Sequence, residues 1–169
     1  MSSQHQNLTH VLKSEEGSAV GLSFGIIVSE WNNEITYSLL QGARETLIKK
    51  GAEENEILIE FVPGAFELPL GAKIMARMTD VDAIICLGCV IRGETPHFDY
   101  VCQAASQGIM QVGLEMELPV IFGVLTVNNV EQALARSGGS LGNKGIEAAY
   151  SAIHMANLAQ RLSRFESNI

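Results

Sequence analysis

The chain has 169 residues, of which 47% are hydrophobic and 18% are charged, and its formal net charge is −8. This composition is typical of a globular domain, and no apolar stretch reaches the roughly 20 residues that a membrane-spanning helix needs. The negative charge disfavours nucleic acid as a partner, because it would repel a phosphate backbone. A chain of this length buries on the order of 70% of its unfolded surface, which is enough for a core without disulfides.

The first residues and the cysteines predict a cytoplasmic protein. Residues 1–18 lack both the apolar core of a secretion signal and the arginine-rich pattern of a transit peptide. Cys86 and Cys89, two of three cysteines, lie in an apolar run. Their spacing is compatible with a metal or redox site, but residues three apart in a strand point to opposite faces. We therefore expect buried, reduced thiols and no metal site.

Apolar runs and helical patterns alternate beyond residue 18. Asn32 or Asn33 is the expected cap of the first helix and Gly51 its end, while Pro69 is tolerated in the first turns of the second helix. The expected elements are, in chain order, a strand at 20–29, a helix at 33–51, a strand at 56–64, a helix at 65–78, a strand at 82–93, a helix at 96–116, a strand at 119–127, a helix at 130–138, a glycine-rich link at 138–145 and a helix at 146–165.

Continuous apolar strands separated by helices predict a parallel sheet that is covered on both faces. We therefore expect one three-layer α/β/α domain with a four-stranded sheet over 19–165, after a polar segment at 1–18 and before a tail at 166–169. In such sheets, ligands bind outside the carboxyl ends of the strands. This rule predicts that four segments meet at one edge: 29–33, 63–67, 91–97 and 126–129.

The segment around His97 has two interpretations. Thr95 can cap a helix, Pro96 suits its first position and Asp99 is favourable in its first turn, so folding alone explains these residues. The same helix start is also a potential anion site, which Gly93 would let an anion approach closely. His97 would then face the anion as a general acid or base. On these residues alone, the purely structural interpretation is favoured.

Other residues at this edge are also ambiguous when taken singly. Trp31 would usually be a core residue, but at a strand end its ring can stack on a heterocycle. Glu67 can balance a helix dipole or accept hydrogen bonds from hydroxyl groups, and Gly64 permits a close backbone approach. Arg136 and Lys144 bracket the glycine-rich link; each would commonly be a solvated charge, although a guanidinium suits phosphate.

Four motifs together resemble the 6,7-dimethyl-8-ribityllumazine synthases of riboflavin biosynthesis: PGAFELP, GCVIRGETPHFDYVC, FGVLTVNNVEQALARSG and GNKGIEAAYSAIHMANL. Their order and spacing match over about residues 20 to 165. The resemblance implies a flavodoxin-like fold and a transferase without metal or organic cofactor. Its expected reaction condenses 5-amino-6-(D-ribitylamino)uracil with 3,4-dihydroxy-2-butanone 4-phosphate to the lumazine, releasing phosphate and water.

The resemblance also implies a role for each matching residue. His97 would move protons and Arg136 would be the main phosphate cation, reaching the pocket from an adjacent subunit. The expected pyrimidine and ribityl contacts are Trp31, Asn32, Gly64, Ala65, Phe66, Glu67, Val90, Ile91, Phe122 and Lys144, of which Phe122 and Lys144 would also come from the adjacent subunit. The expected phosphate contacts are Gly93, Glu94, Thr95 and Arg136.

Members of this family add their N-terminal segment as a strand to a neighbour's sheet and form rings of five subunits. The short link between the last two helices favours a 60-subunit icosahedral shell of such pentamers over a pentamer or decamer. Ser140 and Glu30 stand where many members carry lysine and arginine, respectively. With fewer positive charges near the phosphate, we expect its capture to be weaker.

Two other classes of function remain open at this point. The same sheet edge could bind a flavin or nucleotide without catalysis, although a pairing of His97 with Arg136 favours an enzyme. A mainly structural shell protein, or another phosphosugar enzyme, could also use this fold.

Overall fold

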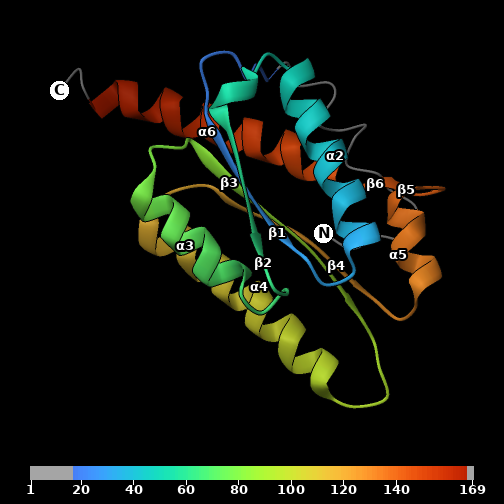
Figure 1. Ribbon diagram of the computed structural model, residues 1–169. Coiled ribbons are helices and arrows are strands. Elements are labelled where there is room, and N and C mark those ends of the chain that lie inside the picture. The colour runs from blue at the N-terminus through green and yellow to red at the C-terminus, as the bar shows by residue number, and fades with distance from the viewer. Residues whose placement is uncertain (1–16, 167–169) are drawn as a thin grey trace.

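Residues 17–166 are described in this computed structural model, and they alternate between strands and helices (Figure 1). The main sheet contains β1 (Phe24–Ser29), β2 (Ile57–Val62), β3 (Ala83–Ile91) and β4 (Val120–Val127). The helices are α2 (Asn33–Lys49), the 3₁₀ turn η1 (Glu54–Glu56), α3 (Leu68–Met78), α4 (His97–Met116), α5 (Val130–Arg136) and α6 (Lys144–Glu166). A small hairpin follows α5 and consists of β5 (Ser137–Gly139) and β6 (Gly142–Asn143).

The four main strands are parallel and lie in the order β2-β1-β3-β4. The chain therefore leaves β1 toward one edge of the sheet and returns on the other side at β3. This reversal makes the gap between the carboxyl ends of β1 and β3 the topological switch point, where ligands bind in flavodoxin-like sheets. The predicted three-layer α/β fold with a flavodoxin-like sheet is confirmed. The predicted strand exchange with a neighbour depends on residues outside the described range.

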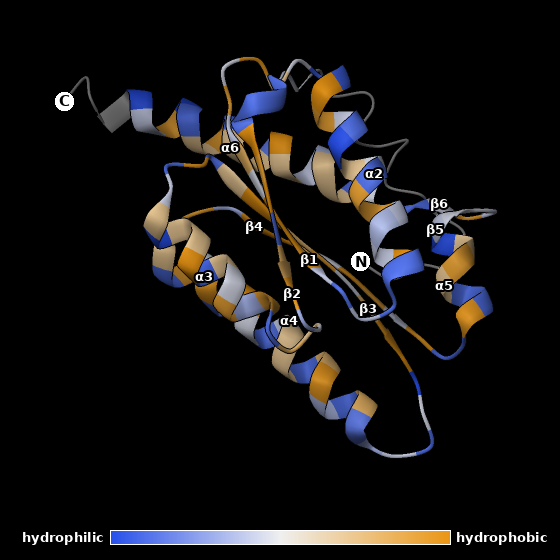
Figure 2. Ribbon diagram, viewed as in Figure 1, coloured by the Kyte–Doolittle hydropathy of each residue, from blue (hydrophilic) through white to orange (hydrophobic). Residues whose placement is uncertain are grey.

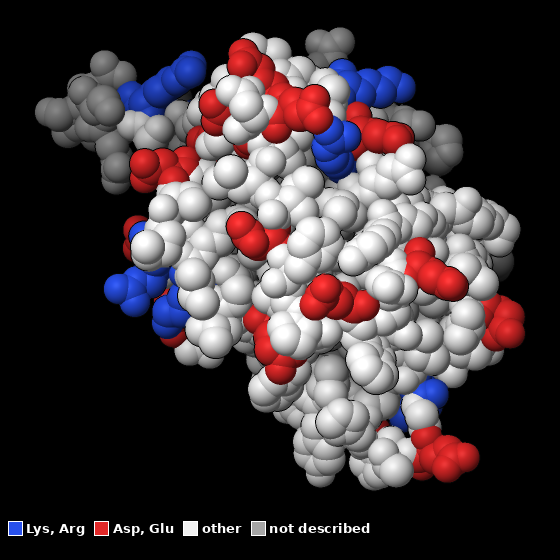
Figure 3. All heavy atoms as spheres, in the orientation of Figure 1, with Lys and Arg blue, Asp and Glu red and all other residues white. Residues whose placement is uncertain are grey.

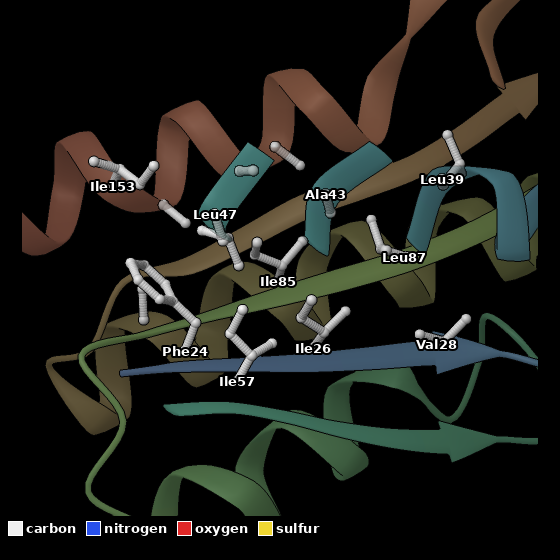
Figure 4. Close-up of a cluster of buried hydrophobic side chains, with 14 of the residues drawn as sticks. Phe24, Ile26, Val28, Leu39, Ala43, Leu47, Ile57, Ile85, Leu87 and Ile153 are labelled. Carbon is white, nitrogen blue, oxygen red and sulfur yellow. The ribbon is translucent and has the colours of Figure 1, made fainter. Parts of the chain in front are cut away.

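Helices cover both faces of the sheet, as Figure 1 shows: α2 and α6 lie on one side, and α3 and α4 lie on the other. All six residues of β1 are buried, and the strands at the centre are the most hydrophobic part of the ribbon (Figure 2). Figure 4 shows β-strand side chains directed toward α2 and α6, where large apolar residues interdigitate. The labelled members of this cluster are Phe24, Ile26, Val28, Leu39, Ala43, Leu47, Ile57, Ile85, Leu87 and Ile153.

The two cysteines of β3 confirm the predicted alternation. Cys86 packs in the cluster on the α3 and α4 side, and Cys89 packs in the cluster on the α2 and α6 side. Burial raises the pKa of Cys86 to about 12 and that of Cys89 to about 11. Both are therefore neutral thiols near pH 7 that cannot share one metal ion.

Several predicted boundaries are wrong by a few residues, and local hydrogen bonding explains why. The first strand begins at Phe24 because residues 20 and 21 form a turn in which Gly21 has a φ of 72°. The second long helix, α3, begins at Leu68 instead of residue 65, because residues 65–67 form a turn in which the Glu67 amide donates to the Gly64 carbonyl oxygen at 3.2 Å. The glycine-rich link contains the β5–β6 hairpin, which was not predicted.

The positions of Gly51 and Pro69 relative to their helices agree with the prediction. Gly51 has a φ of 105° just beyond α2, where a left-handed residue ends the helix at low cost. Pro69 lies in the first turn of α3, where its missing amide proton breaks no helical hydrogen bond. Among the residues described, no helix is long and apolar enough to cross a membrane.

Candidate active site

A pocket of about 690 Å³ lies at the switch point between β1 and β3. Its size is in the range of sites that enclose small organic ligands. Three of the four segments predicted to meet at this edge line it. The lining residues are Trp31, Asn32, Gly64, Ala65, Phe66, Glu67, Cys89, Val90, Ile91, Gly93, Thr95, His97, Phe98 and Val101.

Trp31 presents a large exposed ring at the end of β1. Its amide donates to the carbonyl oxygen of Pro63 at 3.1 Å, which ties the β1 and β2 ends together. The side chain itself is not packed in the core, since the residue is 74% exposed. Of the two interpretations of Trp31, the structure therefore supports a stacking surface over a core residue.

Asn32 occupies the position before α2 but does not cap it through its side chain. Its backbone is left-handed, with a φ of 60°, and its side-chain amide donates instead to the carbonyl oxygen of Cys89 at 2.9 Å. This hydrogen bond bridges the β1 and β3 ends at the pocket. The amide nitrogen is thereby oriented, and the side-chain oxygen is the group of Asn32 that can accept from a ligand.

The last residues of β3 extend beyond their neighbour β1. The β1–β3 pairing ends at Val28 and Leu87, whereas β3 continues to pair with β4 as far as Ile91. The Cys89 carbonyl faces the β1 side and the Arg92 amide faces β4, where it donates to Val127 at 2.9 Å. Since peptide groups alternate along a strand, the backbone of Ile91 faces the pocket side and that of Val90 faces β4. Ile91 is therefore the better placed of the two for main-chain recognition of a ligand edge.

The turn after β2 forms another wall of the pocket. Ala65 is buried and anchors this turn, whereas Phe66 is 61% exposed. Glu67 lies directly before α3, and a Cβ built on Gly64 would come within 3.2 Å of the Glu67 carboxylate. The turn thus presents backbone groups that a ligand can approach closely, together with one carboxylate. Such groups can form hydrogen bonds with a polyhydroxy chain.

The loop over residues 92–96 leads to His97, which is the first residue of α4. The prediction that Thr95 caps this helix is wrong. Pro96 is already in the right-handed helical region and its carbonyl accepts from the Asp99 amide at 2.9 Å, while the N-cap position makes no side-chain capping bond. A Cβ added at Gly93 would meet nothing within 4 Å. The helix start is therefore open, and its amides can meet an anion.

Four of the predicted site residues do not line the pocket within one subunit. Glu94 is exposed on the loop, and Phe122 lies on the edge strand β4. Arg136 ends α5 and donates to the Gln132 carbonyl at 3.1 Å. Lys144 begins α6 and pairs with the buried carboxylate of Glu147 at 2.7 Å.

Sequence reasoning missed three lining residues: Cys89, Phe98 and Val101. Val101 lies one helical turn after His97, so the i, i+4 relationship could have identified it. The backbone side of Cys89 follows no such pattern, because its exposure to the pocket depends on where the β1–β3 pairing ends. Phe98, directly after His97, carries no such signal either.

The electrostatics of the pocket are unusual for a site that would hold a phosphate ester. Glu67 and His97 line it, but no lysine or arginine does. Among the residues described, no group of three or more His, Cys, Asp or Glu side chains is placed to hold a metal ion. The arrangement can stack a ring on Trp31, bind its edge through β3 and exchange protons at His97, but a dianion needs a cation from elsewhere.

The sheet order and the pocket at its switch point define a flavodoxin-like α/β protein with a pocket whose size suits a small organic ligand. A family model described as 6,7-dimethyl-8-ribityllumazine synthase matches residues 21–160. The chain belongs to this family.

Relatives with that printed name align along most of their length. The protein from Cytophaga hutchinsonii is 53% identical over 165 residues, covering 96% of this chain and 100% of the relative. The one from Phocaeicola vulgatus is 48% identical over 164 residues, covering 97% and 98%. The one from Clostridium kluyveri is 52% identical over 153 residues, covering 89% and 99%.

Proposed function

We propose that this protein is the transferase that condenses 5-amino-6-(D-ribitylamino)uracil with 3,4-dihydroxy-2-butanone 4-phosphate, the penultimate step of riboflavin biosynthesis. The products are 6,7-dimethyl-8-ribityllumazine, phosphate and water. Membership of the family supports this activity. The observation that carries the site assignment is one pocket that combines the exposed ring of Trp31, the unpaired edge of β3 and His97.

The proposed roles follow the chemistry of the steps. The pyrimidine stacks on Trp31 and meets Asn32 and the β3 backbone, while the ribityl chain lies along the turn at 64–67. An amine of the pyrimidine attacks the ketone, giving a carbinolamine and then an imine with loss of water. Phosphate leaves by elimination, and the second nitrogen closes the ring with loss of water. His97 moves protons in these steps, and holding both substrates in register supplies much of the rate.

The phosphate would lie at the open helix start over residues 93–95. No lysine or arginine of this subunit lines the pocket. We therefore assign the cation that pairs with the phosphate to Arg136 of an adjacent subunit, and Phe122 and Lys144 of that adjacent subunit would approach the pocket with it. Lys144 is held by the buried Glu147 carboxylate, so its position is fixed before any ligand binds. Glu30 is exposed beside Trp31, where it makes the pocket mouth more negative.

A subunit-mixing experiment tests the origin of Arg136. Hybrids of the His97→Ala and Arg136→Ala variants, refolded together at equal amounts, should regain activity above either parent. In a random mixture, about a quarter of the sites would combine His97 of one subunit with Arg136 of its neighbour. If hybrids are no more active than the average of the parents, Arg136 does not act across a subunit boundary.

We further propose that the subunits form pentamers that assemble into a 60-subunit shell, with a pentamer or decamer as the alternative. The outer faces of α3 and α4 favour an assembly, because they expose apolar side chains whose contact with water is unfavourable. Examples are Leu70, Ile74, Met78, Met110 and Leu114. Sedimentation velocity of the purified protein should give one species near sixty subunits, and a five-subunit species alone would refute the shell.

The proposal includes no metal or organic cofactor, no nucleic acid partner, no membrane association and a cytoplasmic location. On the face drawn in Figure 3, acidic groups are scattered and the lysine and arginine side chains lie toward the margins. That face offers no continuous basic surface to a phosphate backbone.

The direct test mixes the purified protein with both substrates and follows the absorbance and green fluorescence of the lumazine. Wild-type protein should form product, and His97→Ala should lower kcat by about 10²-fold or more while retaining some turnover. Absence of product with freshly made substrates, together with tight binding of riboflavin, would favour a binding module instead.

A further inference from the structure

Arg92 makes three contacts that none of the roles above uses. Its guanidinium pairs with the Asp99 carboxylate, with N–O distances of 3.0 and 3.5 Å. It also lies over the Phe98 ring, 4.2 Å from the ring centre, and its Nε donates to the side-chain oxygen of Asn128 at 3.3 Å. These four residues, Arg92, Phe98, Asp99 and Asn128, are called here the Arg92 clamp.

The clamp closes the base of one loop. Arg92 directly follows β3, whereas Phe98 and Asp99 are in the first turn of α4, so the ion pair joins the two ends of the segment over residues 93–97. Asn128 directly follows β4 and adds a third anchor at the same edge of the sheet. In Figure 1 this loop extends away from the rest of the molecule between β3 and α4.

The segment over residues 93–97, whose two ends the Arg92 clamp joins, is largely surrounded by solvent. Residues 92–97 are all exposed, and the space around a Cβ at Gly93 is open to 4 Å. An exposed ion pair contributes little to the free energy of unfolding of the whole protein. It can still restrict a local segment, because loops open independently of the core.

We infer that Arg92 is a positioning residue: through Asp99, Phe98 and Asn128 it holds the 93–97 loop in the conformation that receives the phosphate of the butanone substrate. This inference rests on the proposed function, since it assigns the phosphate to that loop. A loop that is ordered before binding loses less entropy when the ligand arrives, so the clamp raises affinity without touching the ligand. Phe98 lines the pocket and also packs against the guanidinium.

A simpler electrostatic role makes the opposite prediction for one variant. If Arg92 acted only through its positive charge on the dianion, Asp99→Asn would remove a competing negative charge and lower the KM for the phosphate substrate. If Arg92 positions the loop, both Arg92→Met and Asp99→Asn should raise that KM, and the double variant should be no worse than the poorer single one.

The experiment measures KM for each substrate and kcat in these three variants and in Arg92→Lys. We expect the KM for the butanone phosphate to rise about 3- to 10-fold, while the KM for the pyrimidine substrate changes less than about 2-fold. Arg92→Lys should resemble Arg92→Met, because an ammonium keeps the charge but not the planar, two-pronged geometry. If Arg92→Met does not fold, Asp99→Asn and Arg92→Lys decide the question.

The matched control is the ion pair of Lys73 with Glu115, which has a length of 2.7 Å and comparable exposure. Glu115 lies 16 residues after Asp99 on the same helix, or roughly 24 Å along its axis. Lys73→Met should therefore leave both KM values unchanged. Equal KM values for wild type and all clamp variants, or a lowered KM in Asp99→Asn, would overturn the inference.

Amide hydrogen exchange of the ligand-free protein provides a measurement that does not depend on activity. Arg92→Met should speed exchange in the segment 93–98 and leave the turn at 63–67 unchanged, whereas unchanged exchange at 93–98 would contradict the clamp. Failure of the wild-type protein to make lumazine would instead reject the proposed function, and this exchange measurement would still test the clamp.

Discussion

The side-chain amide of Asn32 donates a hydrogen bond to the carbonyl oxygen of Cys89, across 2.9 Å. The two residues are 57 positions apart in the chain, and their contact joins the ends of β1 and β3 where the strands diverge. The left-handed backbone at Asn32 brings the side chain into this position. One residue therefore helps to shape the pocket and presents an acceptor to it.

Substitutions at Asn32 should separate backbone strain from the hydrogen bond. Asn32→Ala should lower the free energy of unfolding by about 2 kcal/mol, because it loses the hydrogen bond and places a Cβ without compensation in the left-handed region. Asn32→Gly removes the strain and should cost about 1 kcal/mol. Urea unfolding at matched protein concentration measures both, and equal losses would show that the backbone conformation carries no cost.

Trp31 is the only tryptophan, so its fluorescence reports on the pocket alone. Adding the pyrimidine substrate without its partner should quench this fluorescence as the ring stacks. Trp31→Ala should raise the KM for the pyrimidine about tenfold, while Trp31→Phe retains part of the stacking. Because the residue is 74% exposed, neither substitution should shift the midpoint of thermal unfolding of the ligand-free protein by much. A saturating titration without any fluorescence change would contradict the assignment.

Replacement by alanine should affect the free energy of unfolding very differently at two glycines, Gly145 and Gly93. Gly145 lies in the first turn of α6, where an added Cβ would be 1.9 Å from the carbonyl oxygen of Leu39. Because that neighbour is backbone, Gly145→Ala should destabilise the protein by about 3 kcal/mol, although alanine ordinarily favours a helix.

Gly93→Ala is the matched comparison, because its Cβ would meet nothing within 4 Å. Its free energy of unfolding should stay within about 0.5 kcal/mol of wild type. The KM for the phosphate substrate should nevertheless rise, since the methyl group occupies the approach to the loop backbone. Denaturation curves and substrate titrations of both variants check the contrast. A stable Gly145→Ala protein would show that α2 and α6 can separate at this point.

The buried thiol of Cys86 predicts a pH dependence of stability. Burial raises its pKa from 9.0 to about 12, so the folded protein holds a proton that the unfolded chain releases between these values. The contribution to stability is complete below pH 9 and is lost as the pH rises toward 12. Cys86→Ala removes this titration, so its free energy of unfolding should fall less steeply than that of wild type between pH 9 and 11. Parallel curves would mean that the thiol ionises without unfolding.

Much of the architecture follows from local patterns in the sequence. Apolar runs and helical periodicity predicted the strands, the helices and the parallel sheet, because burial on both faces requires continuous apolar strands. Gly51 marked the end of the first helix correctly, and Pro69 lies in the first turn of its helix as expected, both for local reasons. The opposite burial of Cys86 and Cys89 followed from the two-residue repeat of a strand alone.

The details of the pocket depend on contacts between distant segments. Asn32 or Asn33 was predicted to cap α2; Asn32 occupies that position, but its side-chain amide donates to the Cys89 carbonyl oxygen instead of capping the helix. Local propensity cannot report such competition, since the competing group arrives only when β1 and β3 pair.

The sequence by itself therefore determined the fold class, the edge of the sheet where the site lies, and the family, because each is encoded in patterns that a linear chain carries. The tertiary structure decided that the backbone of Ile91, rather than that of Val90, faces the pocket side, that Phe98 lines the pocket, and that Arg92 pairs with Asp99 across the 93–97 loop. The physical reason for the exposed Ile91 backbone is that the β1–β3 pairing ends at Val28 and Leu87 while β3 continues to Ile91, which leaves backbone groups free that no local pattern marks.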